Sequence, residues 1–284
     1  GAQHVLILDG EQLVGSRQNR MTNRSILLPS KSRTEIPVYC MEQGRWHFDS
    51  DTMAPTQQHS PTKVRRRARE TEHRHAAAGL AASPAMLREA QSDVWADISE
   101  TASKVGGHST TGALDNVFAT NIGRIDTWLS AFPLGDDQVG LLAFLGGGPL
   151  ALDLIASHRL YRRVHGRLLR GYVLDAIERL GAAGDDTTVT RERAPAATSS
   201  SEAQGFLDVV RNAARVDAPT VGGGRYNVLT DSVIGGELLH GDRLVHLSAF
   251  PAAAFRSRGT YTAAQDNPVA PPSRRRHHRG GGSA

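Results

Sequence analysis

Cysteine and long apolar runs are nearly absent from this sequence. Its 284 residues include one cysteine, Cys40, which excludes an internal disulfide and a zinc site built from several cysteines. No apolar run approaches the roughly 20 residues that span a bilayer. The apolar run that ends at Leu8 leads directly into Asp9 and is too short for a secretory signal. We therefore expect a protein of the reducing cytoplasm with no membrane segment.

The short motifs of common enzyme classes are also missing. The glycine triplets at 146–148 and 222–224 fit neither G-x-G-x-x-G nor the P-loop pattern. Neither G-x-S-x-G nor H-E-x-x-H occurs, which argues against an α/β-hydrolase and against a zinc protease. The twelve histidines are scattered. His246 alternates with Val245 and Leu247 and is expected on the polar face of a strand, as a structural histidine or as a catalytic base.

Positive charge is concentrated in two segments. Residues 61–75 hold six lysines and arginines against two glutamates, and residues 267–284 hold four arginines and no acidic residue. We interpret both segments as solvated and flexible, which leaves the remaining chain mildly acidic. The alternative is weak, salt-sensitive binding of RNA or DNA by these segments. Specific nucleic-acid recognition is not predicted, because it requires basic residues on one folded face.

The pattern of apolar residues predicts a single α+β (mixed α/β) domain over residues 1–260. Strands are expected at 5–8, 25–28, 36–40 and 138–145, the last covered on both faces, and between 220 and 250, with a hairpin at Gly241. About four helices are expected, including one that starts near 84, one at 123–132, a long one at 157–180 and one at 201–214. We expect the N- and C-terminal strands to share a mixed sheet. Exposed loops at 49–84 and 181–200 and a disordered tail at 261–284 complete the prediction; two subdomains joined near 49–84 are the alternative.

Two carboxylates flank the first predicted turn. Asp9 and Glu11 stand on either side of Gly10, directly after a buried strand. Such a pair binds a hard cation such as Mg²⁺ or acts as an acid and base. The alternative is a turn in which Asp9 bonds its own backbone.

Two further groups of polar residues follow in the N-terminal region. The first group is Gln18, Asn19, Arg20 and Asn23. Its amides are suited to reading a base or ribose and Arg20 to binding phosphate; the alternative is a hydrogen-bonded loop. Glu42, Arg45 and Trp46 surround the turn at residue 44. Trp46 is suited to stacking on a purine and Arg45 to holding a phosphate. The alternative places Trp46 in the core and pairs Arg45 with Glu42.

Several short stretches of this sequence match the pattern of one known family. The most specific is EIPVYCMEQGRW at 35–46, because it combines Pro, Cys, Gly, Arg and Trp in fixed order. The others are LDGE at 8–11, GSRQNR at 15–20, QSDVW at 91–95, LDL at 152–154, LLRGYVLDA at 168–176 and LVHLSAF at 244–250. In these stretches the sequence resembles the ARG and rhodanese-phosphatase-superfamily-associated protein domain family. The resemblance implies one α/β domain and an association with ADP-ribose and NAD-derived nucleotide metabolism, but it carries no catalytic residues.

The leading hypothesis is a domain that binds or processes an ADP-ribose-like nucleotide metabolite at a water-accessible hollow in the N-terminal region. Its predicted catalytic residues are Glu11 and Glu42, and its predicted ligand-binding residues are Asp9, Gln18, Asn19, Arg20, Arg45 and Trp46. No protein metal ligands are assigned, although Mg²⁺ fits the carboxylates. The alternative is a non-enzymatic structural or oligomerisation module, in which these residues pair with one another and are closed off.

Overall fold

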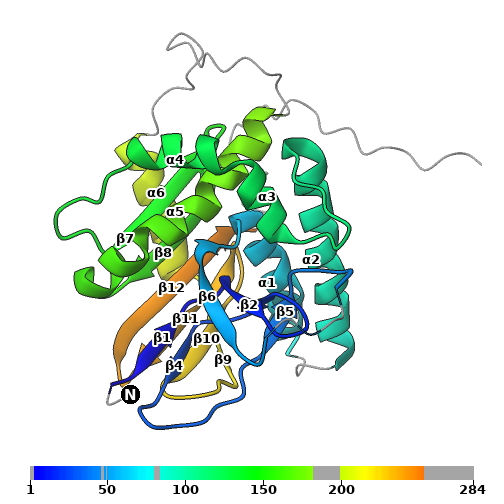
Figure 1. Cartoon of the computed structure of the whole chain (residues 1–284). Helices are drawn as coiled ribbons and strands as arrows, with labels where there is room; N and C mark the ends of the chain where they lie inside the picture. Colours follow the sequence, from blue (N-terminus) through cyan, green and yellow to red (C-terminus); the bar gives the residue numbers. More distant parts are fainter. Residues whose placement is uncertain (1–2, 46–47, 49, 80–83, 182–198, 253–284) are drawn as a thin grey trace, which may run out of the picture.

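A computed structural model describes residues 3–45, 48, 50–79, 84–181 and 199–252, without the side chains of residues 84–87. It confirms the α+β class, with helices packed around antiparallel sheets (Figure 1). No described helix is both long and apolar enough to cross a bilayer. The predicted tail at 261–284, and most of the predicted loop at 181–200, lie outside the described residues.

The largest sheet has six strands, all paired antiparallel. In spatial order these strands are β7 (Gly140–Leu145), β8 (Gly148–Ile155), β12 (Arg243–Pro251), β11 (Val233–His240), β10 (Arg225–Leu229) and β9 (Arg215–Ala218). The predicted hairpin is confirmed, because Gly241 lies between β11 and β12 with a φ of 58°. β7 was expected to be covered on both faces. It is instead an edge strand, and each of its residues is only half-buried.

The N-terminal strands form two smaller sheets. A four-stranded sheet has the order β5 (Val38–Cys40), β3 (Arg20–Thr22), β2 (Glu11–Gly15) and β6 (Met53–His59), and a two-stranded sheet joins β1 (Val5–Ile7) to β4 (Ile26–Leu28). The prediction of one mixed sheet shared by both ends of the chain was therefore wrong. Among the described residues, one isolated β-bridge, between Leu27 and Gly223, joins β4 to the loop that precedes β10.

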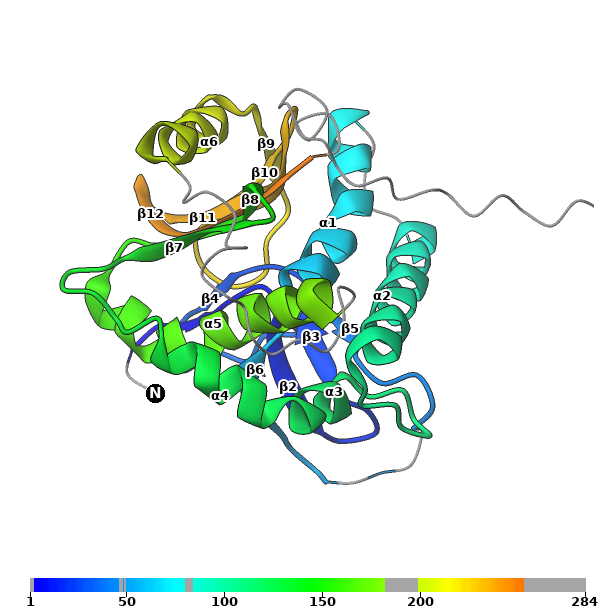
Figure 2. The ribbon, with the colours of Figure 1, turned by 90° about the horizontal axis from the view of Figure 1, so that it is seen from above.

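The helices cover both faces of the six-stranded sheet. They are α1 (Thr62–Ala77), α2 (Pro84–Val105), α3 (Leu114–Thr120), α4 (Ile122–Ser130), α5 (His158–Gly181) and α6 (Ser200–Asn212). Figure 2 shows α6 on one face of the sheet and α1 and α5 on the other, beside the N-terminal sheets. Phe206 and Val210 of α6 pack on Leu152 and Leu247. The largest buried apolar cluster joins α1, α2 and α5 to Phe250 on the opposite face.

The prediction of a loop at 49–84 was wrong, because this segment forms β6 and the whole of α1. The segment lacks apolar periodicity because the buried stripe of α1 is partly polar. Thr62, Arg65 and Arg69 are buried at helical spacing beside Val64 and Ala68. A stripe of this composition resembles a solvated charge run when only hydrophobicity is considered. The basic stretch is therefore an ordered helix that places Arg65 and Arg69 in the core, and the prediction of a flexible segment was wrong.

Two glycines of α5 provide a matched test of how closely this helix packs on the N-terminal region. A Cβ at Gly171 would lie 2.7 Å from the backbone oxygen of Ser60, whereas a Cβ at Gly166 would meet nothing within 4 Å. We expect Gly171→Ala to lower the free energy of unfolding by about 1–3 kcal/mol through overpacking. Gly166→Ala should raise it by about 0.5–1 kcal/mol through helix propensity. Urea denaturation measures both, and equal effects of the two substitutions would refute the close contact.

Candidate functional site

The two-residue period of β8 and β12 places three polar side chains on one face of the six-stranded sheet. Asp153 stands opposite Ser248 in the register, and His246 lies two residues before Ser248 on the same face. Their neighbours Leu152 and Leu247 point to the other face and pack under α6. All three polar side chains are at most 1% exposed. The sheet therefore directs a polar patch toward α1 and the N-terminal strands.

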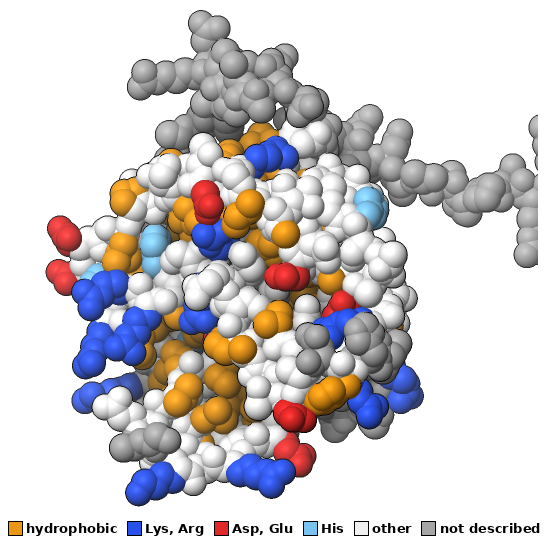
Figure 3. Space-filling model, viewed as in Figure 1, with side chains coloured by type: hydrophobic (Ala, Val, Ile, Leu, Met, Phe, Trp, Pro, Cys, Tyr) orange, Lys and Arg blue, Asp and Glu red, His pale blue; other side chains and the backbone are white. Residues whose placement is uncertain are grey.

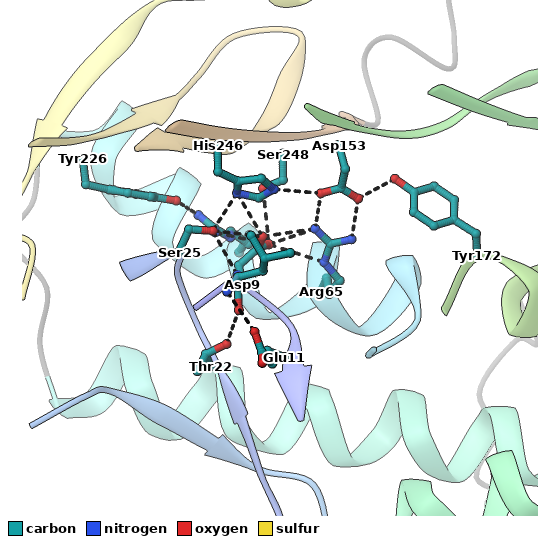
Figure 4. A network of polar contacts seen from close by, with 12 residues as sticks. Asp9, Glu11, Thr22, Ser25, Arg65, Asp153, Tyr172, Tyr226, His246 and Ser248 are labelled. Carbon is teal, nitrogen blue, oxygen red and sulfur yellow. Dashed lines mark hydrogen bonds and ion pairs between the residues drawn. The ribbon is translucent and has the colours of Figure 1, made fainter. Parts of the chain in front are cut away.

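Arg65 of α1 meets this patch with its guanidinium group. Its Nη1 and Nη2 donate to the two carboxylate oxygens of Asp153 at 2.8 and 2.6 Å, and its Nη2 also lies 3.1 Å from Oδ1 of Asp9. The ring of Phe250 lies 5.2 Å from the guanidinium carbon. Figure 4 shows Arg65 between the two carboxylates. One guanidinium thus joins α1, the six-stranded sheet and the end of β1.

Asp9 reaches this position because of the turn after β1. Gly10 has a φ of 81°, and a Cβ there would lie 2.6 Å from the Cδ of Arg65, so glycine is required both for the turn and for the close approach. Asp9 also accepts from Ser248 Oγ at 3.2 Å, and Arg69 Nη2 lies 3.3 Å from its Oδ2. Burial by itself raises the pKa of Asp9, but the charges of Arg65 and Arg69 outweigh it and hold the pKa well below its usual value.

His246 connects the two carboxylates through Ser25. Its Nδ1 lies 2.7 Å from Ser25 Oγ, and its Nε2 lies 3.3 Å from Oδ1 of Asp153. Ser25 Oγ accepts from the backbone N–H of Asp9 at 3.0 Å, and the hydroxyl of Tyr172 donates to Asp153 at 2.6 Å. We call this set the buried ionic network: Asp9, Ser25, Arg65, Arg69, Asp153, Tyr172, Tyr226, His246 and Ser248.

Three residues of the buried ionic network are spaced as metal ligands would be, but Arg65 already binds the two carboxylates among them. One ligand atom from each of Asp9, Asp153 and His246 lies within 4.8 Å of the other two. However, both carboxylates accept hydrogen bonds from Arg65, whose pKa is raised well above its usual value: burial lowers it, but the charges of Asp153 and Asp9 outweigh burial. A metal ion at this position would compete with a permanent cation. The residues therefore do not fit Mg²⁺, and the guanidinium neutralises the carboxylates instead.

His59 lies at the end of β6 near the buried ionic network. It is 3% exposed, and neither ring nitrogen has a hydrogen-bond partner. Burial, reinforced by the nearby charge of Arg65, lowers its pKa to about 3 against the opposing charge of Asp153. His59 is therefore neutral at physiological pH.

Most of the predicted site residues form a separate, closed group, here called the N-terminal polar cluster: Gln18, Asn19, Arg20, Glu42 and Arg45. Arg45 Nε donates to Glu42 at 2.8 Å, and Arg45 Nη2 donates to Asn19 Oδ1 at 3.0 Å. Gln18 Nε2 donates to the backbone oxygen of Glu42, and Arg20 Nη1 donates to Gln18 Oε1. Gln91 of α2 bonds both the N–H and the C=O of Cys40. The residues of the cluster thus pair with one another, and Gln91 joins the four-stranded sheet to α2.

Asp9 and Glu11, the carboxylates on either side of Gly10, lie outside the N-terminal polar cluster and bind different partners. Asp9 points into the buried ionic network, whereas Glu11 accepts from Arg167 Nη1 of α5 at 3.0 Å and from the backbone N–H of Leu8. The left-handed turn at Gly10 sends the two side chains to different partners. Trp46 lies outside the described residues. The prediction that all these residues gather around one open hollow was wrong, because their charges are satisfied in three separate places.

An open cavity lies between α5 and β1, which we call the α5–β1 recess. It has a volume of about 550 Å³, within the range of small-molecule sites, roughly 300–1,000 Å³. Its lining residues are Gln3, His4, Val5, Leu6, Leu8, Ile155, Leu160, Arg163, Val164 and Arg167. Six of them are aliphatic. Figure 3 shows the hollow as a hydrophobic surface bordered on one side by Lys and Arg side chains.

The α5–β1 recess carries positive charge from one helix face. Arg163 and Arg167 are one turn apart on α5, so that their side chains are neighbours. Arg167 pairs with Glu11, whereas Arg163 is exposed and makes no ion pair with any described residue. None of the described lining residues is acidic. The recess therefore has an apolar floor and a cationic wall.

The sequence analysis did not identify the arginines of the buried ionic network and of the α5–β1 recess. Arg65 and Arg69 were assigned to a loop, although their spacing with Thr62 is that of one helix face. Arg163 and Arg167 fall within the helix predicted at 157–180 but were not singled out, although their i,i+4 spacing places them side by side. That spacing was the available signal in both cases. The strand β1 was predicted, but its position beside α5 was not identifiable from the sequence because it depends on tertiary packing.

The fold and these two features define an α+β domain with a buried ionic centre and an open recess. The family model of the ARG and Rhodanese-Phosphatase-superfamily-associated Protein domain matches residues 1–250, and the chain belongs to this family. The resemblance found in the sequence is thereby confirmed. No match was found among curated proteins or among solved structures.

Proposed function

We propose that this domain binds a small phosphate-bearing metabolite of the ADP-ribose or NAD-derived type in the α5–β1 recess. The observation that carries the proposal is the recess itself, with its six aliphatic lining residues and with Arg163, which has no ion-pair partner among the described residues, beside Arg167. An apolar floor accommodates a base, and guanidinium groups bind phosphate with charge-assisted hydrogen bonds. The proposed activity is binding, because the described lining residues offer no carboxylate, thiol or hydroxyl group for catalysis.

Geometry favours this recess over the residues predicted from the sequence. The N-terminal polar cluster is already paired, so a ligand there would have to break existing hydrogen bonds. Among the predicted residues that the structure describes, Glu11 forms hydrogen bonds with two lining residues of the recess, Leu8 and Arg167. We therefore assign Glu11 the role of orienting Arg167, in place of the predicted role in catalysis.

The test is calorimetric titration of the full chain with ADP-ribose, supported by thermal melting at millimolar ligand. Removing both guanidiniums in Arg163→Ala/Arg167→Ala should weaken binding by about 10- to 100-fold, since a hydrogen bond to a charged group contributes about 1.5–3 kcal/mol. Arg162→Ala is the matched control, because Arg162 is exposed on the same helix and does not line the recess. Equal losses in both variants, or an unchanged melting temperature of the unmodified chain, would refute the proposal.

One observation favours the second candidate, a non-enzymatic structural or oligomerisation module. The N-terminal polar cluster and the buried ionic network are closed and mutually paired, and the recess exposes 53% of Val5 and 38% of Leu160. This candidate predicts a dimer that buries the recess. Light scattering decides between the two: a dimer dissociated by Val5→Asp with no ADP-ribose binding supports the module, and a ligand-binding monomer excludes it.

A further inference from the structure

The order in which residues line the α5–β1 recess shows that β1 borders it with an edge. Gln3, His4, Val5 and Leu6 are consecutive, and all four line the recess. Side chains of a strand alternate between its two faces, so consecutive residues line one cavity when the strand's edge faces it. Among the described residues, β1 pairs only with β4. Its other edge is therefore directed at the recess.

The register identifies which backbone groups this edge presents. Gly223 donates its N–H to the C=O of Leu27 at 2.7 Å, so the backbone groups of Leu27 point away from β1. Leu27 stands opposite Leu6, and in an antiparallel pair two opposed residues point their groups either toward each other or both outward. The N–H and C=O of Leu6 therefore point outward, into the recess. No described residue forms a hydrogen bond with either group.

The next outward-pointing donor along this edge confirms the direction. Leu8 has the same parity as Leu6, and its N–H donates to Oε2 of Glu11, whose Oε1 accepts from Arg167. The edge, Glu11 and the cationic wall therefore lie around one space. Because Leu8 N–H is occupied and β1 is three residues long, the free edge is too short to add a peptide strand, which requires a longer row of free groups. A small molecule fits this edge better than a peptide.

We propose that the α5–β1 recess binds a nucleoside diphosphate, with the base read by the backbone of Leu6 and the diphosphate held by Arg163 and Arg167. Leu6 presents one donor and one acceptor side by side, which matches a base edge that carries an adjacent acceptor and donor. The aliphatic residues between Leu6 and the arginines cover the faces of the base. Two guanidiniums one helical turn apart match two linked phosphates. This inference rests on the proposed function and specifies its ligand class.

The experiment compares ADP with inorganic pyrophosphate by calorimetric titration. The unmodified chain should bind ADP at least about tenfold more tightly than pyrophosphate, since two hydrogen bonds and the buried base add 1.4 kcal/mol or more. Leu6→Pro removes the outward N–H and no bond to β4, and proline is tolerated at a sheet edge. It should lower ADP affinity about tenfold and leave pyrophosphate affinity unchanged. Leu6→Val keeps the N–H and should keep the preference for ADP.

A second measurement needs no variant, which matters if Leu6→Pro fails to fold. ADP with two methyl groups on the amino nitrogen of the base lacks the donor, and it should bind the unmodified chain about as weakly as pyrophosphate. Equal binding of ADP and pyrophosphate, or full binding of the methylated ADP, overturns base reading while phosphate binding stands. Binding of neither ADP nor pyrophosphate overturns both this inference and the proposed function.

Discussion

Replacing Arg65 with methionine should lower the free energy of unfolding by about 3–5 kcal/mol, the cost of leaving buried charges without their partner. The substitution removes the guanidinium that bonds Asp9 and Asp153, which are 1% and 0% exposed. Methionine has a similar length and is apolar, so the loss reports on charge more than on volume. Urea denaturation at neutral pH measures it.

A neighbouring residue supplies the matched control for this experiment. Arg66 lies on the same helix, is half-buried and pairs with Glu70 one turn away, so Arg66→Met should cost less than about 1 kcal/mol. Adding Asp9→Asn and Asp153→Asn to Arg65→Met should restore part of the lost stability, because the unpaired charges are then absent. If Arg65→Met costs no more than Arg66→Met, the buried ionic network does not organise the fold.

Two buried groups should make opposite contributions to the dependence of stability on pH. Burial raises the pKa of Asp175 to about 7, against hydrogen bonds from Thr62 that lower it, and burial lowers the pKa of His59 to about 3. The contribution of Asp175 is fully present below its unfolded pKa of 3.8 and is lost as pH rises through 7. The contribution of His59 is present above its unfolded pKa of 6.5 and is lost as pH falls through 3.

Between about pH 4 and pH 6.5, Asp175 makes the free energy of unfolding fall with pH and His59 makes it rise. In this window the folded chain holds a proton on Asp175 and none on His59, and the unfolded chain does the reverse. Relative to the unmodified chain, Asp175→Asn should therefore make stability rise with pH, and His59→Asn should make it fall. Each slope should change by up to about 1.4 kcal/mol per pH unit.

Urea denaturation at several pH values in this window tests the two slopes. The charged groups that bear on the two residues are Glu178 beside Asp175, and Arg65, Asp153, Asp9 and His246 around His59. The double variant His59→Asn/Asp175→Asn serves as the control and should return to the pH profile of the unmodified chain. Single variants whose profiles match that of the unmodified chain would show that neither group titrates as proposed.

Local patterns determined most of the elements. The apolar stripe of α5 and the stop at its C-terminal glycine are encoded within a few turns of the chain, and Ser199 with Glu202 forms a capping box that starts α6. The hairpin of β11 and β12 follows from its turn residues. Such elements were predictable because their main determinants are neighbours in the sequence.

The position of a strand within its sheet was not predictable in the same way. The strand predicted at 138–145 was expected to be covered on both faces, yet β7 lies at an edge of the sheet. An apolar run reports that a strand has something to bury, but strand order depends on pairings between residues far apart in the chain. The division of the N-terminal strands into two small sheets, apart from the six-stranded sheet, depends on the same long-range pairings.

The sequence by itself determined the α+β class, the family and the presence of charged residues in the N-terminal region. Tertiary structure alone decided which charges neutralise one another and which stay open to a ligand. Arg65 and Asp153 are 88 residues apart in the chain and 2.6 Å apart in space, whereas Arg163 has no described partner. The free energy of a buried charge depends on its partner and its distance from water, and neither quantity can be read from the order of residues along the chain.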